Sequence, residues 1–214
     1  MFELGVKFLV SYFLGSIMGA LTMGKLKGNI DIRAMGSGNA GGTNALRTQG
    51  KLFALGVIII DIGKGVIAVS LVPQWVLPIT MQEPQISRDV LILCCAFAAV
   101  MGHVWPMWHQ FKGGKGAATL IGAFLVISPL LVAVMLITFI VILTLFGFVG
   151  LATMLSVASV SLYLLWMGMA INNPLFVYTI TMTLYLIYTH RSNVQRMISG
   201  NEPRNKKVMI FSRR

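Results

Sequence analysis

The sequence predicts an all-α integral membrane protein that forms one domain over residues 1–214. Apolar residues make up 57% of the chain, whereas soluble domains rarely exceed about half. Several apolar runs approach the roughly 20 residues that a helix needs to cross a bilayer. Helices are expected in these runs because an open strand edge would leave backbone groups without hydrogen-bond partners in lipid.

The apolar runs predict seven transmembrane helices, over residues 3–24, 51–72, 89–107, 117–128, 130–148, 151–170 and 174–190. The first run lacks a positively charged start and a small-residue cleavage site, so we expect a retained span and not a signal peptide. The long apolar stretch 116–149 is compatible with one tilted helix or with two helices broken at Ser128-Pro129. The distribution of positive charge favours two.

The basic residues predict how the chain is oriented. With seven helices and the N-terminus outside, most of the 17 Lys and Arg residues fall in cytoplasmic segments, and the C-terminus is cytoplasmic. These residues are Lys25, Lys27, Arg33, Arg47, Lys51, Lys112, Lys115, Arg191, Arg196, Arg204, Lys206, Lys207, Arg213 and Arg214. The net charge of +11 therefore indicates topology and contact with anionic lipid at the cytoplasmic loops. No nucleic-acid-binding motif is present, so no nucleic acid partner is expected.

The helix over 117–128 is expected to be short. Its twelve residues rise only about 18 Å, which is less than the hydrocarbon core of a bilayer. It starts directly after Gly113-Gly114-Lys115-Gly116, so its free N–H groups and positive dipole end suit a phosphate. In the predicted topology, this loop, the segment 36–47 and the segment from His190 all lie on the cytoplasmic face.

Two glycine-rich polar stretches interrupt the apolar sequence. They are Gly36-Ser37-Gly38-Asn39-Ala40-Gly41-Gly42-Thr43-Asn44-Ala45-Leu46-Arg47 and Phe111-Lys112-Gly113-Gly114-Lys115-Gly116. Glycine lets a ligand approach backbone N–H groups, and the Ser, Asn, Thr, Arg and Lys side chains add donors, so both stretches indicate anion binding. The alternative is that both are flexible connections, which explains so many donors less well. Neither is a nucleotide-binding motif, because no strand precedes the first and Gly116 replaces the Ser or Thr of a P-loop.

Polar residues elsewhere give further candidates. His190 and Asn193 are three residues apart, so a continuing helix would place both on one face, within reach of a ligand. Glu202 is interpreted as an ion-pair anchor for basic loops. Ser156, in the sixth predicted span, either packs a helix or donates to a ligand.

The predicted spans also contain structural patterns. Asp61 and Lys64 lie at i,i+3 in the second span, where a structural ion pair is favoured over a substrate role. Ser11, Gly15 and Gly19 recur every fourth residue in the first span, which is typical of closely packed helices.

Three motifs together resemble those of the bacterial acyl-phosphate:glycerol-3-phosphate acyltransferases, the PlsY family. The first motif is Gly36-Ser37-Gly38-Asn39 with Gly42-Thr43-Asn44 and Arg47. The second runs from Gly102-His103 to Gly116, and the third runs from His190-Arg191-x-Asn193 to Gly200-x-Glu202. The resemblance covers almost the whole chain, in order.

The resemblance implies a reaction and a location. An acyl group would pass from acyl phosphate to the sn-1 hydroxyl of glycerol 3-phosphate, giving 1-acyl-glycerol 3-phosphate (lysophosphatidic acid) and inorganic phosphate, as the first step of phospholipid synthesis. The protein would lie in the bacterial cytoplasmic (inner) membrane with its active site facing the cytoplasm, and it would need no cofactor.

The resemblance also implies which residues act. Glycerol 3-phosphate would be held by Ser37, Arg47, Lys115, His190 and Asn193, and less firmly by Ser156, while the Gly113–Gly116 loop would bind acyl phosphate. The chain has three histidines, and Asp does not follow any of them five residues on. The His-x4-Asp box of the soluble-type glycerophosphate acyltransferases is therefore absent.

The residue types favour direct acyl transfer. Arg47 can bind a phosphate bidentately, whereas Lys115 would act as a point charge. The base is His190 or the substrate's own phosphate, whose second pKa is about 6, and the phosphate is favoured. No acyl-enzyme is expected because no nucleophile–base pattern is evident, and no metal because carboxylates are scarce. The competing hypothesis is a transporter or channel for phosphate-containing anions, which fits less well because the polar clusters share one face and no internal repeat is visible.

Overall fold

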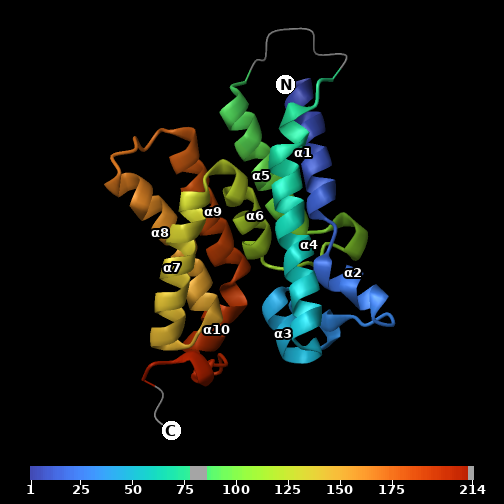
Figure 1. The fold of residues 1–214 in the computed structure, drawn as a ribbon, viewed down its shortest axis with the longest axis vertical. Helices are drawn as coiled ribbons and strands as arrows, with labels where there is room; N and C mark the ends of the chain where they lie inside the picture. Colours follow the sequence, from blue (N-terminus) through green and yellow to red (C-terminus); the bar gives the residue numbers. More distant parts are fainter. Residues whose placement is uncertain (78–85, 212–214) are drawn as a thin grey trace. The chain divides into compact units, whose positions relative to one another are not determined.

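The computed structural model describes residues 1–77 and 86–211, so Arg213 and Arg214 lie outside the described residues. Within those ranges the chain forms helices, turns and loops and contains no strand, as the sequence predicts (Figure 1). Its contacts divide it into two compact units, Met1–Ile127 and Ser128–Arg214.

The first unit is built around four apolar helices. Its elements are α1 (Phe2–Gly15), α2 (Gly19–Leu26), η1 (Ile32–Ala34), α3 (Gly42–Gln49), α4 (Lys51–Ser70), η2 (Val72–Gln74), α5 (Arg88–Val104), η3 (Met107–His109) and α6 (Ala117–Ile127). Helix α1 packs against α5, and α4 packs against α6 (Figure 1). The short helices α2 and α3 pack against α4.

The second unit is a group of three apolar helices with a short terminal helix. Its elements are α7 (Pro129–Phe146), α8 (Val149–Trp166), α9 (Pro174–Thr189), α10 (Arg191–Ile198) and η4 (Lys206–Val208). Helix α8 packs against both α7 and α9, and the short helix α10 packs against α8 and α9.

Each of the seven predicted apolar segments contains helix. Among the described residues, four helical segments are long and apolar enough to cross a membrane: Lys51–Gln74, Arg88–His109, Pro129–Phe146 and Val149–Trp166. The pair α1 and α2 makes a fifth if it counts as one span, and α6 and α9 are shorter apolar helices. The structure thus supports four or five spans by length, and the count of seven stays a prediction.

The first predicted span, 3–24, is not one continuous helix. It breaks after Gly15, and α2 is bent by 43° from α1. The break leaves backbone groups without helical partners, and the pair Asp61 and Lys64 on α4 satisfies two of them. The Ile17 carbonyl accepts from Lys64 Nζ at 2.7 Å, and the Gly19 N–H donates to Asp61 Oδ1 at 3.1 Å. Hydropathy did not reveal this break because both halves are apolar.

Glycines set the close approach of α1 and α5. A Cβ on Gly15 would lie 2.1 Å from the Ala99 carbonyl oxygen, and one on Gly102 would lie 2.1 Å from the Tyr12 carbonyl oxygen. No other residue fits at these distances, and small residues are what allow helix backbones to meet in membranes. The close packing predicted from Gly15 is therefore confirmed.

Candidate active site

The first glycine-rich stretch is folded around the side chain of Asn44, which is only 2% exposed. Its Nδ2 donates to the carbonyl oxygens of Ile32, Met35 and Asn39, each at 3.0 Å, and its Oδ1 accepts from the Ser37 N–H at 3.0 Å. Both the oxygen and the nitrogen of the Asn44 amide are therefore bonded to the backbone of this loop. Asn44, predicted as a ligand donor, therefore serves first to shape the segment that presents Ser37.

Half of this stretch is helical, which the sequence did not predict. Helix α3 begins at Gly42, so Thr43 lies in its first turn and Arg47 in its last. The side chains of Ser37, Thr43 and Arg47 are exposed, and Asn39 is half-buried. Ser37, before Asn44, and Arg47, after it, are therefore exposed to an anion in solution.

The second glycine-rich stretch uses its glycines for packing. The Gly113 N–H donates to the Val104 carbonyl at 3.1 Å, and the Gly114 N–H donates to the His103 carbonyl at 3.0 Å. This differs from the expectation that these two N–H groups face a ligand. Lys115 follows directly and is half-buried, and α6 begins two residues later with N–H groups that have no helical acceptor.

Substituting Gly114 by alanine is expected to lower both activity and thermal stability. Its Cβ would lie 2.1 Å from His103 Nε2, so the loop or the imidazole must move. Overpacking of this kind costs about 1–3 kcal/mol. The measurements are thermal unfolding and the rate of the acyl transfer that the resemblance implies. Gly63→Ala is the matched control, because a Cβ there has open space around it. Equal melting temperatures and rates in the two variants would contradict the packing role.

The imidazole of His103 belongs to a buried polar cluster with Asp61 and Lys64. Lys64 Nζ lies 3.1 Å from Asp61 Oδ1 and 2.8 Å from His103 Nδ1. His103 Nδ1 lies 3.4 Å from Asp61 Oδ1, and the three residues are at most 4% exposed. The ion pair expected from the i,i+3 spacing is present. It connects the break between α1 and α2 with the residue against which Gly114 packs.

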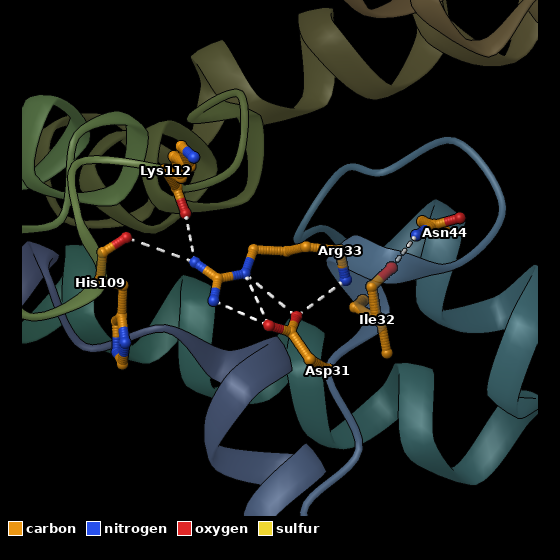
Figure 2. Close-up of polar contacts among 6 residues, drawn as sticks. All are labelled: Asp31, Ile32, Arg33, Asn44, His109 and Lys112. Atoms are coloured by element: carbon orange, nitrogen blue, oxygen red, sulfur yellow. Dashed lines mark hydrogen bonds and ion pairs between the residues drawn. The ribbon is translucent and has the colours of Figure 1, made fainter.

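The two glycine-rich stretches are connected by Arg33. Its Nη1 donates to the Lys112 carbonyl at 3.0 Å and to the His109 carbonyl at 3.3 Å, as Figure 2 shows. The same guanidinium is paired with Asp31. From the sequence, Arg33 is predicted only as one of the cytoplasmic basic residues that orient the chain. Its position three residues before the first glycine-rich stretch is the feature of the sequence that points to a role at the site.

In the second unit, His190 lies at the junction of α9 and α10 and is 5% exposed. Its Nδ1 is 2.8 Å from the Leu186 carbonyl oxygen. A carbonyl can only accept, so Nδ1 carries a proton, and Nε2 is the nitrogen that can accept one when the ring is neutral. The fold thus fixes the tautomer that a base or an acceptor for a hydroxyl requires.

Asn193 lies one turn after His190 and is held by Glu202. Asn193 Nδ2 donates to Glu202 Oε1 at 2.6 Å, and Arg196 Nε donates to Glu202 Oε2 at 2.7 Å. The carboxylate therefore bridges two α10 side chains, which is the anchoring contact expected of Glu202. Gly150 brings the start of α8 close to Asn193, because a Cβ there would lie 2.9 Å from its Nδ2.

Ser156 is 3% exposed, and its hydroxyl donates to the Thr153 carbonyl at 2.8 Å. This bond within α8 is typical of a packing serine, and it leaves the oxygen as an acceptor. Among residues 1–77 and 86–211, no three His, Cys, Asp or Glu side chains are grouped so as to hold a metal ion.

This chain is similar to known proteins over nearly its whole length. Residues 6–200 match a protein family described as Glycerol-3-phosphate acyltransferase. A protein of that name from Prochlorococcus marinus (strain MIT 9515) is 36% identical and covers 91% of this chain and 93% of its own length. Another from Bacillus subtilis (strain 168) is 38% identical, with coverage of 92% and 95%.

Two solved structures share the fold. Both are crystal structures of PlsY, an integral membrane glycerol 3-phosphate acyltransferase, one in a glycerol 3-phosphate form and one in a lysophosphatidic acid form. The TM-scores are 0.79 and 0.78, and the sequence identities are 30% and 29%. Each match covers 94% of both chains.

Proposed function

We propose that this chain, which belongs to the glycerol-3-phosphate acyltransferase family, takes its acyl group from an acyl phosphate. The family match over residues 6–200 makes it a membrane-embedded glycerol-3-phosphate acyltransferase of phospholipid synthesis. The donor is the finer question. The observation that carries our proposal is the chemistry of the two glycine-rich stretches, which hold Ser37, Arg47 and Lys115 for phosphate but no His-x4-Asp box.

We assign the cationic residues to phosphate recognition. Arg47 is exposed on α3 and presents a planar fork of donors that matches two phosphate oxygens. Lys115 supplies a point charge beside the start of α6, where helical N–H groups add positive potential. Ser37 and Thr43 add hydroxyl donors. Asn39 and Asn44 keep the loop folded, as the Asn44 bonds support.

The proposed reaction is a single displacement at the acyl carbon. The sn-1 hydroxyl oxygen of glycerol 3-phosphate forms a bond to the carbonyl carbon, and the bond from that carbon to the phosphate oxygen breaks. Inorganic phosphate leaves with the electron pair, and the hydroxyl proton passes to the phosphate of glycerol 3-phosphate. Positioned cations stabilise the charge that develops on the oxygens.

We assign His190 and Asn193 to positioning the acceptor. The contact of His190 Nδ1 with the Leu186 carbonyl favours the tautomer in which Nε2 is the hydrogen-bond acceptor, which suits it to a substrate hydroxyl. Asn193 Nδ2 donates to Glu202 Oε1, which orients the amide, and an amide oxygen such as its Oδ1 can accept a hydrogen bond from a substrate hydroxyl. Ser156 is a weaker candidate because its proton already binds Thr153.

We further propose seven spans, with the N-terminus outside and the C-terminus in the cytoplasm of a bacterial cell, so that the site faces the cytoplasm. The charge distribution supports this orientation. The basic tail would meet anionic lipid. Its Asn205 N–H donates to the Gly147 carbonyl at 2.8 Å, which holds it beside the end of α7, and Lys206 and Lys207 are exposed there.

The donor is tested with purified protein, labelled glycerol 3-phosphate, and either palmitoyl phosphate or palmitoyl-CoA. We expect lysophosphatidate and an equal amount of inorganic phosphate from palmitoyl phosphate, with little product from palmitoyl-CoA. Comparable turnover of palmitoyl-CoA would contradict the proposed donor. Counterflow of labelled phosphate in liposomes without lysophosphatidate formation would instead favour the transport hypothesis.

A further inference from the structure

We propose that Arg33 and Asp31 form a clamp that keeps the second glycine-rich stretch in register with the first, so that the acyl group reaches glycerol 3-phosphate and not water. This inference rests on the proposed acyl phosphate donor. Arg33 is a positioning residue in this proposal, because it acts through the backbone of the second stretch and not on a substrate.

One edge of the guanidinium is fixed by Asp31, as Figure 2 shows. Arg33 Nε lies 3.0 and 3.1 Å from the two carboxylate oxygens, and Nη2 lies 2.8 Å from Oδ2. The Arg33 N–H also donates to Asp31 Oδ1 at 2.9 Å. The hydrogen bonds from Arg33 lower the pKa of Asp31, so the carboxylate stays ionised at neutral pH.

The remaining edge of the Arg33 guanidinium binds the backbone of the second glycine-rich stretch and of the residues just before it. Arg33 Nη1 donates to the carbonyls of Lys112 and His109. Between these two residues, Gln110 and Phe111 have φ values of 57° and 56°, a left-handed conformation that non-glycine residues rarely adopt. Two such residues in succession persist only where surrounding contacts hold them. Backbone bonds from the Phe111 N–H to the Pro106 carbonyl and from the Lys112 N–H to the His109 carbonyl hold this turn, and the Arg33 bonds on both sides of it add to that hold.

The clamp joins two segments that each have hydrogen bonds of their own. Arg33 lies next to Ile32, whose carbonyl is bound by Asn44, so its backbone moves with the loop that presents Ser37. Lys112 lies three residues before Lys115 in a segment held at Gly113 by the Val104 carbonyl. A change at Arg33 would therefore shift Lys115 relative to Ser37 without disrupting either segment.

A simple surface ion pair is the competing explanation. The side chains of Arg33 and Asp31 are 27% and 45% exposed, and exposed pairs typically contribute about 0–1 kcal/mol to stability. A stabilising role alone therefore predicts small changes in the melting temperature, the transfer rate and the hydrolysis rate. The clamp predicts a selective effect on transfer, because misplacing two bound reactants by about 1 Å can slow their reaction by about 10²-fold. Hydrolysis by water needs no such orientation.

The test is the partition of the acyl group between lysophosphatidate and free fatty acid. Arg33→Lys keeps the positive charge but loses the planar set of donors that bonds Asp31 and the two carbonyls at once. Asp31→Asn removes the carboxylate that holds the guanidinium in place. For both variants we expect the transfer rate to fall about tenfold or more and the ratio of hydrolysis to transfer to rise severalfold, at nearly unchanged melting temperature. Arg88→Lys, at the exposed start of α5, is the control and should behave as the wild type.

An unchanged partition ratio in Arg33→Lys and Asp31→Asn would overturn the clamp while leaving the proposed donor intact. If the wild type made no lysophosphatidate from acyl phosphate, the donor would be wrong instead. The clamp would then be decided by hydrogen exchange of residues 107–115. Faster exchange there in Arg33→Lys than in Arg88→Lys supports it, and equal exchange overturns it.

Discussion

Replacing Arg47 with alanine is expected to lower kcat/KM for glycerol 3-phosphate by about 10²–10³-fold, the usual loss when one preorganised donor to a developing charge is removed. The side chain is exposed on α3, so its removal should leave the fold intact. Arg47→Lys should recover only part of the loss, because lysine keeps the charge without bidentate geometry. Initial rates at varied concentrations of each substrate measure both effects.

The control for Arg47 is Lys51→Ala. Lys51 is also exposed, at the start of the next helix, and carries the same charge. If the loss of Arg47 acted only through net charge, both variants would lose activity equally, and high salt would weaken the wild type to the same level. A specific phosphate contact predicts that Lys51→Ala stays close to the wild type.

Replacing His190 with glutamine is expected to lower kcat by about 10²-fold, the loss that a misplacement of the acceptor by about 1 Å can cause. The pH profile carries the more informative result. If the phosphate of glycerol 3-phosphate accepts the proton, the rise in rate near pH 6 follows the second pKa of that phosphate and persists in His190→Gln. If His190 is the base, the rise disappears with the imidazole.

A substrate analogue separates these two mechanisms further. A phosphonate analogue of glycerol 3-phosphate has a higher second pKa, so substrate assistance predicts that the rise moves to higher pH with the analogue. A profile that stays fixed with the analogue and vanishes in His190→Gln would contradict substrate assistance. Since His190 is buried and bonded to Leu186, thermal unfolding of the variant must accompany the kinetics.

The glycines of the second glycine-rich stretch have a different role from the one that their sequence pattern predicts. From the sequence alone, the N–H groups of Gly113 and Gly114 are predicted to be donors for phosphate. In the structure both N–H groups bind carbonyls of the preceding segment, and side chains there would collide with His103. The glycines allow close packing, and the positive charge at this position comes from Lys115 and the start of α6. The two roles have the same sequence pattern because both require the absence of a Cβ.

The sequence by itself determined the class of the protein, the positions of its apolar helices, the Asp61–Lys64 pair and the motifs of its family. These features depend on hydropathy and on spacings of a few residues, which are local properties of a chain in lipid. Tertiary structure decided the rest: the break after Gly15, the contact of Lys64 with His103, 39 residues away, and the bond from Arg33 to the Lys112 carbonyl, 79 residues away. The Arg33 bond ends on a backbone oxygen, which every residue type carries, and the Lys64–His103 contact joins side chains that lie on different helices. Neither kind of contact leaves a local pattern of residue types in the sequence.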